Sequence, residues 1–149
     1  MSFNPFSFDA SIYTRLVSTT TGLVQGVWNT QAPPGIKLTA NGAPYVIMEL
    51  INGTFDPTTF SVNIADATYR VSVYDHDENG LVPSHTIIAR IFGDSEGTDN
   101  DPSTGLARWK IPAVTDVATA LLRPEEFGTQ HSEGVLHHWM TFSIEVQEA

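Results

Sequence analysis

Residues 67–80, which read ATYRVSVYDHDENG, constrain the fold of this chain more than any other stretch. Up to Tyr74 apolar and polar residues alternate, and the apolar side consists of Ala67, Tyr69, Val71 and Val73. Alternation with a period of two, rich in β-branched and aromatic residues, predicts a strand with one buried face. Residues 75–80 then break the pattern with Asp, Asn and Gly, and a helix-like segment follows. This unit lies mid-chain, so both halves of the sequence are expected to pack on it.

Further strands are predicted on both sides of this segment. Pro44–Ile51 is apolar on both faces, which predicts a central strand paired antiparallel with residues 67–74. Asn52 and Gly53 indicate a turn directly after it. Pro124–Gly134 has the composition of a polar turn. The remaining expected strands are Gly26–Thr30, Arg108–Val114, which Pro112 places at an edge, Asp116–Arg123 and Trp139–Val146. For Asp116–Arg123 the composition also allows a helical turn, and a strand is favoured.

The first of two predicted helices follows Ser7, whose side chain is of the type that caps helix N-termini. Apolar residues then recur at helical spacing until a run of Ser and Thr leads to Gly22, where the helix is expected to end. The spacing indicates one apolar stripe that packs on the sheet. The stripe consists of Phe8, Ile12 and Leu16, with Tyr13 and Val17 beside it.

The second predicted helix spans Leu81–Phe92. Pro83 fits its first turn, where a missing backbone N–H costs nothing. Gly93 is expected to end it, because glycine readily adopts the backbone conformation that follows a helix. The side expected to be buried consists of Ile88, Ile91 and Phe92, with Ile87 nearby.

This order of elements segregates helices from strands, which predicts an α+β fold with a largely antiparallel sheet of four to six strands and two helices packed on it. The length of 149 residues suits one domain, so residues 1–149 are expected to form a single unit. Residues 1–6 are expected to form a loose arm. Residues 94–107 are expected to form an inserted acidic loop, because the stretch up to Gly105 has four acids, no base and no large apolar residue.

The composition excludes several classes of protein. The chain has 17 acidic and 7 basic residues and a net charge of −10, whereas a protein that grips nucleic acid needs Lys and Arg to neutralise phosphates. It has no cysteine, so disulfides are excluded. No stretch approaches the ~20 apolar residues of a membrane helix. The opening MSFNPFSF lacks the basic start and apolar core of a signal peptide, so we expect a chain made and folded in a cytoplasm.

One stretch partly matches a metal-binding motif. Asp75, Asp77, Asn79 and Gly80 fit the first six positions of a calcium loop, but the twelfth position is Thr86 instead of the bidentate Glu that closes such a site. The same residue types are typical of a turn between a strand and a helix. No zinc-binding helix motif, nucleophile elbow or glycine-rich phosphate loop is present. We therefore expect no catalytic, cofactor-binding or metal-binding residues, and a protein that is not an enzyme.

Four local features, taken in order, suggest a family. The first helix contains IYTRLVS, and the strand PYVIMELING follows, introduced by Ala43. The strand ATYRVSVYDHDENG then runs into a helix, and GVLHHWMTFSIEV joins a glycine and a His pair to an alternating strand. Together they resemble the tail terminator (tail completion) proteins of long-tailed bacteriophages. The resemblance covers about half of the chain. Asp94–Gly105 and Arg108–Val114 depart from it as an insertion, and the second helix is shorter than the family's.

Proteins of that family form a ring, usually of six subunits, at the head-proximal end of the phage tail tube. The resemblance implies a structural virion protein that ends tube growth and joins tail to neck. Its implied partners are further copies of itself, the major tail (tube) protein and neck or head-completion proteins, without a membrane. DNA would pass through without sequence-specific binding, and an acidic lumen would repel its phosphates. The alternatives are a neck or head-completion ring and, from another class, a calcium-binding module at Asp75–Gly80.

Aromatic residues outside the periodic segments are candidates for subunit contacts, because several exposed together usually indicate a partner surface. The candidates are Phe3, Phe6, Phe55, Phe60 and Trp109. For Trp109, Phe55 and Phe60, core packing within one chain is the alternative. The acidic loop is expected to lie in solvent or to face the lumen. Its acids are Asp94, Glu96, Asp99 and Asp101.

Overall fold

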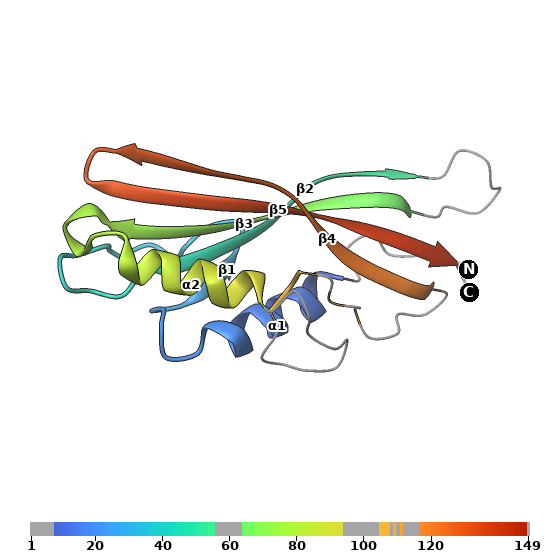
Figure 1. The fold of residues 1–149 in the computed structure, drawn as a ribbon, viewed down its shortest axis with the longest axis horizontal. Coiled ribbons are helices and arrows are strands. Elements are labelled where there is room, and N and C mark those ends of the chain that lie inside the picture. Colours follow the sequence, from blue (N-terminus) through green and yellow to red (C-terminus); the bar gives the residue numbers. More distant parts are fainter. Residues whose placement is uncertain are drawn as a thin grey trace.

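The computed structural model describes residues 8–55, 64–93, 105–107, 109, 111 and 117–148. These residues form a five-stranded mixed sheet with two α-helices packed on one of its faces (Figure 1). The predicted α+β class is therefore confirmed. Within the described ranges, neither helix is both long and apolar enough to cross a membrane.

The sheet has the strand order β1-β2-β3-β5-β4, in which β1 runs parallel to β2 and all other neighbours are antiparallel. β5 therefore lies between β3 and β4, while β1 and β4 form the two edges. Glu133 and Gly134 join β4 to β5 with φ angles of 51° and 83°. Positive φ at both positions is typical of tight hairpin turns. The elements are α1 (Asp9–Thr20), β1 (Val27–Asn29), β2 (Tyr45–Phe55), β3 (Ile64–His76), a 3₁₀ turn (Asp77–Asn79), α2 (Val82–Phe92), β4 (Val117–Ser132) and β5 (Val135–Glu148).

The hydrophobic core lies between the helices and one face of the sheet. The stripe predicted for the first helix is confirmed, because Phe8, Ile12 and Leu16 are each at most 1% exposed. Alternate residues of the strands meet this stripe, and their cross-strand register aligns Met48 with Val71 and Met140. The three central strands contribute Val46, Met48, Ala67, Tyr69, Val71, Val73, Met140, Phe142 and Ile144 to this core.

The outer flank of α1 differs from the prediction. Tyr13 and Val17, expected beside the buried stripe, are 39% and 41% exposed. Each directly follows a buried residue of the stripe, Ile12 or Leu16, and so lies about 100° further round the helix, whereas a helix on a sheet buries only the stripe that faces it. The start of α1 is held by the Tyr69 hydroxyl, which donates to the Asp9 carboxylate. Ser7, the predicted cap, lies outside the described residues.

α2 also presents a different side from the one predicted. Its buried residues are Ser84, Ile87 and Ile91, whereas Ile88 is only partly buried and Phe92 is 39% exposed. The prediction was therefore right for Ile91 and wrong for Phe92. The buried set recurs once per turn, and Ile88, Ala89 and Phe92 lie on the flank that faces β4. Gly93 ends the helix with a φ of 86°, as predicted.

The turn predicted at Asn52 and Gly53 is wrong, because β2 continues through both residues to Phe55. Asn52 pairs with Thr68 and Gly53 with Ala67. A register shift between Leu50 and Asn52 takes up the extra residue as a bulge. Pairing with the long strand β3 thus overrides the local turn signal.

The turn predicted over Pro124–Gly134 is also wrong, except for its last two residues. β4 runs through Pro124 to Ser132, with a register shift between Pro124 and Glu126. Proline is tolerated there because β4 is an edge strand and its outer backbone groups have no ladder partner. The predicted edge strand at Arg108–Val114 is not formed by Trp109 or Ile111, its two described residues. β4 occupies that edge instead, and the N–H of Leu122 donates to the Trp109 carbonyl at 3.0 Å.

Candidate functional site

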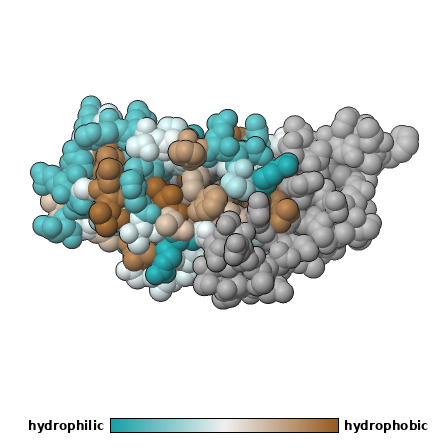
Figure 2. Space-filling model, viewed as in Figure 1, coloured by the Kyte–Doolittle hydropathy of each residue, from teal (hydrophilic) through white to brown (hydrophobic). Residues whose placement is uncertain are grey.

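An apolar groove of about 510 Å³ lies between α2 and the edge strand β4. Figure 2, seen from the same side as Figure 1, shows hydrophobic side chains gathered over α2 and the neighbouring part of β4. The rotation of α2 about its axis explains the groove, since its partly exposed apolar flank faces the edge strand β4 and not the central strands. The lining residues are His85, Ile88, Ala89 and Phe92 of α2, residues 124–129 of β4, and His138, Trp139 and Met140 of β5.

Phe127 is the most exposed large hydrophobic residue in the described part of the chain, at 87%. It pairs with Met140 in the register, which places it on the helix-bearing side of the sheet. A phenylalanine this exposed on an edge strand loses the free energy that burial would give it. The combination of an exposed ring and a neighbouring groove is typical of a surface that meets a partner.

His138 lies at the floor of this groove and joins three elements. Its Nε2 is 3.1 Å from the hydroxyl of Ser84 on α2, and its Nδ1 is 3.0 Å from the hydroxyl of Thr129 on β4. The His138 side chain is 3% exposed, and burial, helped by His85, holds its pKa below the ordinary value, against an opposing effect of Asp75. The neutral imidazole suits this position, because each ring nitrogen has a hydroxyl partner that can donate or accept.

A second hollow, of about 440 Å³, lies at the opposite edge of the sheet, between α1 and β1. The exposed Tyr13 and Val17 of α1 line it together with Val24, Val27 and Trp28. Beside it the Gln25 amide donates to the carbonyl of the exposed Lys37 at 3.1 Å. The lining of the hollow is mixed, because Thr20, Thr21 and Gln25 contribute to it beside these apolar residues.

The sheet face away from the helices carries a row of rings across four strands. Ring centroids are 5.8 Å apart for Trp28 and Tyr45, 5.2 Å for Tyr45 and Tyr74, 4.2 Å for Tyr74 and His137, and 5.4 Å for His137 and Trp139. All five rings are half-buried. Cross-strand aromatic pairs of this kind stabilise a sheet and give it a stiff face.

His137 and His138 point to opposite faces of β5, as predicted for adjacent residues of a strand. His137 stacks on Tyr74, and burial first, then Arg70, lowers its pKa. Arg70 in turn pairs with Glu49 at 2.7 Å on the same face. The two histidine side chains thus lie on opposite faces of the sheet and do not bind one ligand together.

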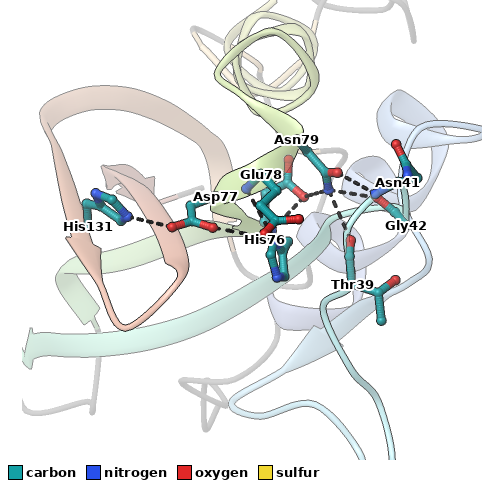
Figure 3. Close-up of polar contacts among 9 residues, drawn as sticks. Thr39, Asn41, Gly42, His76, Asp77, Glu78, Asn79 and His131 are labelled. Atoms are coloured by element: carbon teal, nitrogen blue, oxygen red, sulfur yellow. Dashed lines mark hydrogen bonds and ion pairs between the residues drawn. The ribbon is translucent and has the colours of Figure 1, made fainter.

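The turn at Asp75–Gly80 is held by hydrogen bonds within the chain (Figure 3). Asp75, which is fully buried, accepts at Oδ1 from Asn79 Nδ2 at 2.8 Å. Asn79 Nδ2 also donates to the carbonyls of Thr39 and Gly42, at 3.2 and 3.1 Å, and its Oδ1 accepts from the N–H of Asn41 at 2.6 Å. These contacts tie the turn to the loop before β2, which supports the interpretation of Asp75 and Asn79 as turn residues.

Asp77, in the same turn, points the other way, toward the β4–β5 hairpin. Its Oδ2 lies 3.1 Å from Nε2 of His131 (Figure 3). The N–H of Glu78 donates to Nδ1 of His76 at 3.1 Å. The described residues contain no group of three or more metal-ligating side chains.

The residues predicted as subunit contacts are only partly described. Phe55 is the last residue of β2 and pairs with Ile64. Trp109 is 7% exposed in the core of its own chain, with the Arg15 guanidinium 4.8 Å from its ring centroid, so core packing accounts for it. The others lie outside the described residues: Phe3, Phe6 and Phe60, and the loop acids Asp94, Glu96, Asp99 and Asp101.

Sequence reasoning missed the groove and Phe127. Phe127 falls in a stretch interpreted as a polar turn, and as a single aromatic among polar residues it creates no periodic pattern. The sequence could have indicated Phe127 in one way only, as a large apolar residue that stands alone in a polar segment. Tyr13 and Val17 were named, but as part of the buried helix stripe.

No protein-family model matches this chain, and no curated protein matches it either. Among solved structures it is similar to a chain from the "Virion of native gene transfer agent (GTA) particle", with a TM-score of 0.57 and 15% identity over 94% of this chain and 93% of that chain. A second solved protein, identified only by a sequence code, has a TM-score of 0.61 and 10% identity over 99% of both chains. At these identities, the chain shares its fold with a chain of a gene transfer agent virion across nearly its whole length.

Proposed function

We propose that this chain is a structural virion protein of the tail terminator type. In this proposal, copies form a ring, of six subunits, at the head-proximal end of a tail tube. The ring ends tube growth by covering the last ring of the major tail protein, and it offers its other face to neck or head-completion proteins. The protein acts through surfaces and carries out no reaction.

The observation that carries the proposal is the fold shared with a chain of the gene transfer agent virion, over 94% of this chain and 93% of the other. A match of this extent covers nearly the whole fold of both chains, and not only one supersecondary motif that many folds share. The resemblance in residues 44–53, 67–80 and 134–146 points to the same class of protein from the sequence. The apolar groove and hollow add surfaces suited to partners, as a ring protein requires.

The charge of the chain suits a ring through which DNA passes. Its net charge is −10, with 17 acidic residues against 7 basic ones. A ring of such subunits repels the phosphate backbone and leaves DNA free to slide. We therefore expect the purified protein not to retain double-stranded DNA at physiological salt.

Two measurements test the proposal together. Mass photometry of the purified chain is expected to show a closed oligomer, and deletion of its gene is expected to give tail tubes of uncontrolled length in electron micrographs. Tubes of normal length that end without capsids would instead indicate a neck or head-completion ring. Particles that form normally without the gene would refute a structural role in the virion.

A further inference from the structure

We propose that the N-terminal half of α2, residues 82–86, is an acid-sensitive latch on the sheet. At neutral pH the latch is closed over β5 through the contact between Ser84 and His138. In mild acid it unwinds and leaves the sheet, while the C-terminal half of α2 stays in place. The latch is independent of the proposed ring and adds a conformational device to the proposed function.

The N-terminal half of α2 buries very little apolar surface. Among residues 81–86 only Ser84 is buried, while Leu81 and Val82 are 50% and 76% exposed. The N-cap residue, Leu81, gives the first turn no side-chain hydrogen bond. A segment with so few buried apolar contacts opens at a low free energy.

The C-terminal half of α2 is attached by several contacts. Ile87 and Ile91 are at most 1% exposed in the core. The carbonyl of Ile91 accepts from the N–H of Leu106 at 2.7 Å, and the carbonyl of Phe92 accepts from the N–H of Ala107 at 3.0 Å. We therefore expect opening to stop at Ile87.

One polar contact joins the latch to the sheet. The Ser84 hydroxyl lies 3.1 Å from Nε2 of His138, and within the described ranges this is the one side-chain hydrogen bond between α2 and the sheet. Nδ1 of His138 lies 3.0 Å from the hydroxyl of Thr129. Both partners are uncharged, so they satisfy a neutral imidazole but supply no counter-charge to a protonated one.

Three elements present titratable or charged groups toward His138. On α2, the ring of His85 lies 5.3 Å from that of His138. On β3, the buried Asp75 favours the protonated ring, but no hydrogen bond joins the two residues in the described part of the chain. On β4, His131 lies two residues beyond Thr129 and pairs with a turn residue, Asp77, at 3.1 Å. Burial, helped by His85, outweighs Asp75 and holds the pKa of His138 below its ordinary value.

Opening of the latch removes both causes of this shift. Water then reaches His138 and His85 moves away from it, so the pKa of His138 returns to the ordinary value of about 6.5. Below that pH the open state binds a proton that the closed state does not. The opening equilibrium constant should therefore rise by up to about tenfold per pH unit, down to the pKa of His138 in the closed state. The groove between α2 and β4 opens with it at the end where His85 lies.

Hydrogen exchange of the full chain at pH 7.5 and pH 5 tests the latch. Protection of each amide is taken relative to an unstructured chain at the same pH, which removes the intrinsic pH dependence of exchange. Protection of the amides of residues 85–88 should fall by about tenfold in acid, and that of residues 91 and 92 should change much less.

Two histidine variants assign the response to His138. Because His138→Gln cannot take up a proton, its amides at residues 85–88 should be protected nearly equally at both pH values. His137→Gln is the matched control, since it removes the adjacent histidine on the opposite face of β5 and should keep the response of the wild type.

A second pair of variants tests the contact itself at pH 7.5. Ser84→Ala removes one hydrogen bond between the latch and the sheet, so protection of residues 85–88 should fall by about 2- to 12-fold. Thr86→Ala is the matched control, because the Thr86 hydroxyl donates to the Val82 carbonyl at 2.8 Å within the helix and does not contact the sheet. Its protection should stay close to that of the wild type.

Three results would overturn the latch. The first is an equal loss of protection in both halves of α2, which indicates unfolding of the whole helix. The second is a wild type without an acid response, or a His138→Gln variant that keeps the full response. The third is Ser84→Ala with the protection of the wild type, and this test holds even if His138→Gln does not fold. Tail length after gene deletion tests the proposed function separately.

Discussion

The hydroxyl of Ser84 on α2 lies 3.1 Å from Nε2 of His138 on β5. Ser84 Oγ also lies within 3.2 Å of the Leu81 carbonyl, to which it donates, so it can accept from Nε2–H. Thr129 then satisfies Nδ1 at 3.0 Å. A neutral imidazole in this position thus links α2, β5 and β4 at the floor of the groove.

This arrangement predicts that stability falls in mild acid. Burial lowers the pKa of His138, with His85 adding to the effect and Asp75 opposing it, and burial likewise lowers that of His137. Below about pH 6.5, the ordinary histidine pKa, the unfolded chain therefore binds more protons than the folded chain. The free energy of unfolding should decline from that pH down to the folded-state pKa values.

Denaturant melts between pH 5 and 7.5 check the prediction. In His138→Gln the decline should be smaller than in wild type, because one of the two titrating groups is gone. Gln130→Ala is the control, since Gln130 is an exposed residue of β4 that carries no titrating proton. An identical slope in His138→Gln and wild type would contradict the assignment.

Two phenylalanines at opposite extremes of exposure test the core. Phe142 is fully buried and Phe127 is 87% exposed. Phe142→Ala should lower the free energy of unfolding by ~3–5 kcal/mol, through lost burial and the cavity left behind. The same change at Phe127 should alter it by less than about 0.5 kcal/mol in the dissociated chain. A loss under about 1 kcal/mol at Phe142 would show that β5 is misplaced.

Trp139 packs over Gly128, and this contact predicts a coupled pair. A Cβ on Gly128 would overlap the indole ring of Trp139. Gly128→Ala should therefore lower the free energy of unfolding by ~1–3 kcal/mol, as forced overpacking does. In a Trp139→Ala background the same change should be nearly neutral, because the ring is absent. A double-mutant cycle measures the difference, and equal costs in both backgrounds would contradict the contact.

The turn at Asp75–Gly80 is expected to matter for stability and not for calcium. Asn79→Ala removes donors and an acceptor used by Asp75, Asn41 and Gly42, so it should lower the free energy of unfolding by about 1–3 kcal/mol. Asn52→Ala, at an exposed position on β2, is the control and should change it by under about 0.5 kcal/mol. Calorimetric titration with calcium is expected to show no binding tighter than millimolar. A micromolar site would revive the calcium-binding module.

The strands that the sequence predicts well are those with one buried face. β5 alternates strictly from Leu136 to Ile144 and β3 nearly so, because residues such as Val71 and Phe142 face the core and their neighbours point to the other face. β4 lacks this pattern from Pro124 onward. Both faces of this part of the edge strand are exposed, so neither face requires apolar residues at alternate positions. Its extent follows from pairing with β5, which local sequence does not encode.

The groove could not be predicted for a related reason. Its walls come from α2 and β4, and which flank of α2 faces β4 depends on how the helix sits on the sheet. Ile87 and Ile88 are adjacent and equally apolar, so composition cannot decide which of them is buried. The opposite orientations of His137 and His138, in contrast, follow directly from strand geometry and were predicted.

The position of β5 inside the sheet has a consequence for synthesis of the chain. β3 is complete at His76, but its second neighbour begins only at Val135, after α2 and β4 have been made. At roughly 5–20 residues per second, translation leaves one edge of β3 bare for seconds on the ribosome. That edge offers unpaired backbone groups next to Tyr69 and Val71, a template for pairing with other nascent chains. The interval between making β3 and making β5 is therefore when this edge is open to pairing with another chain.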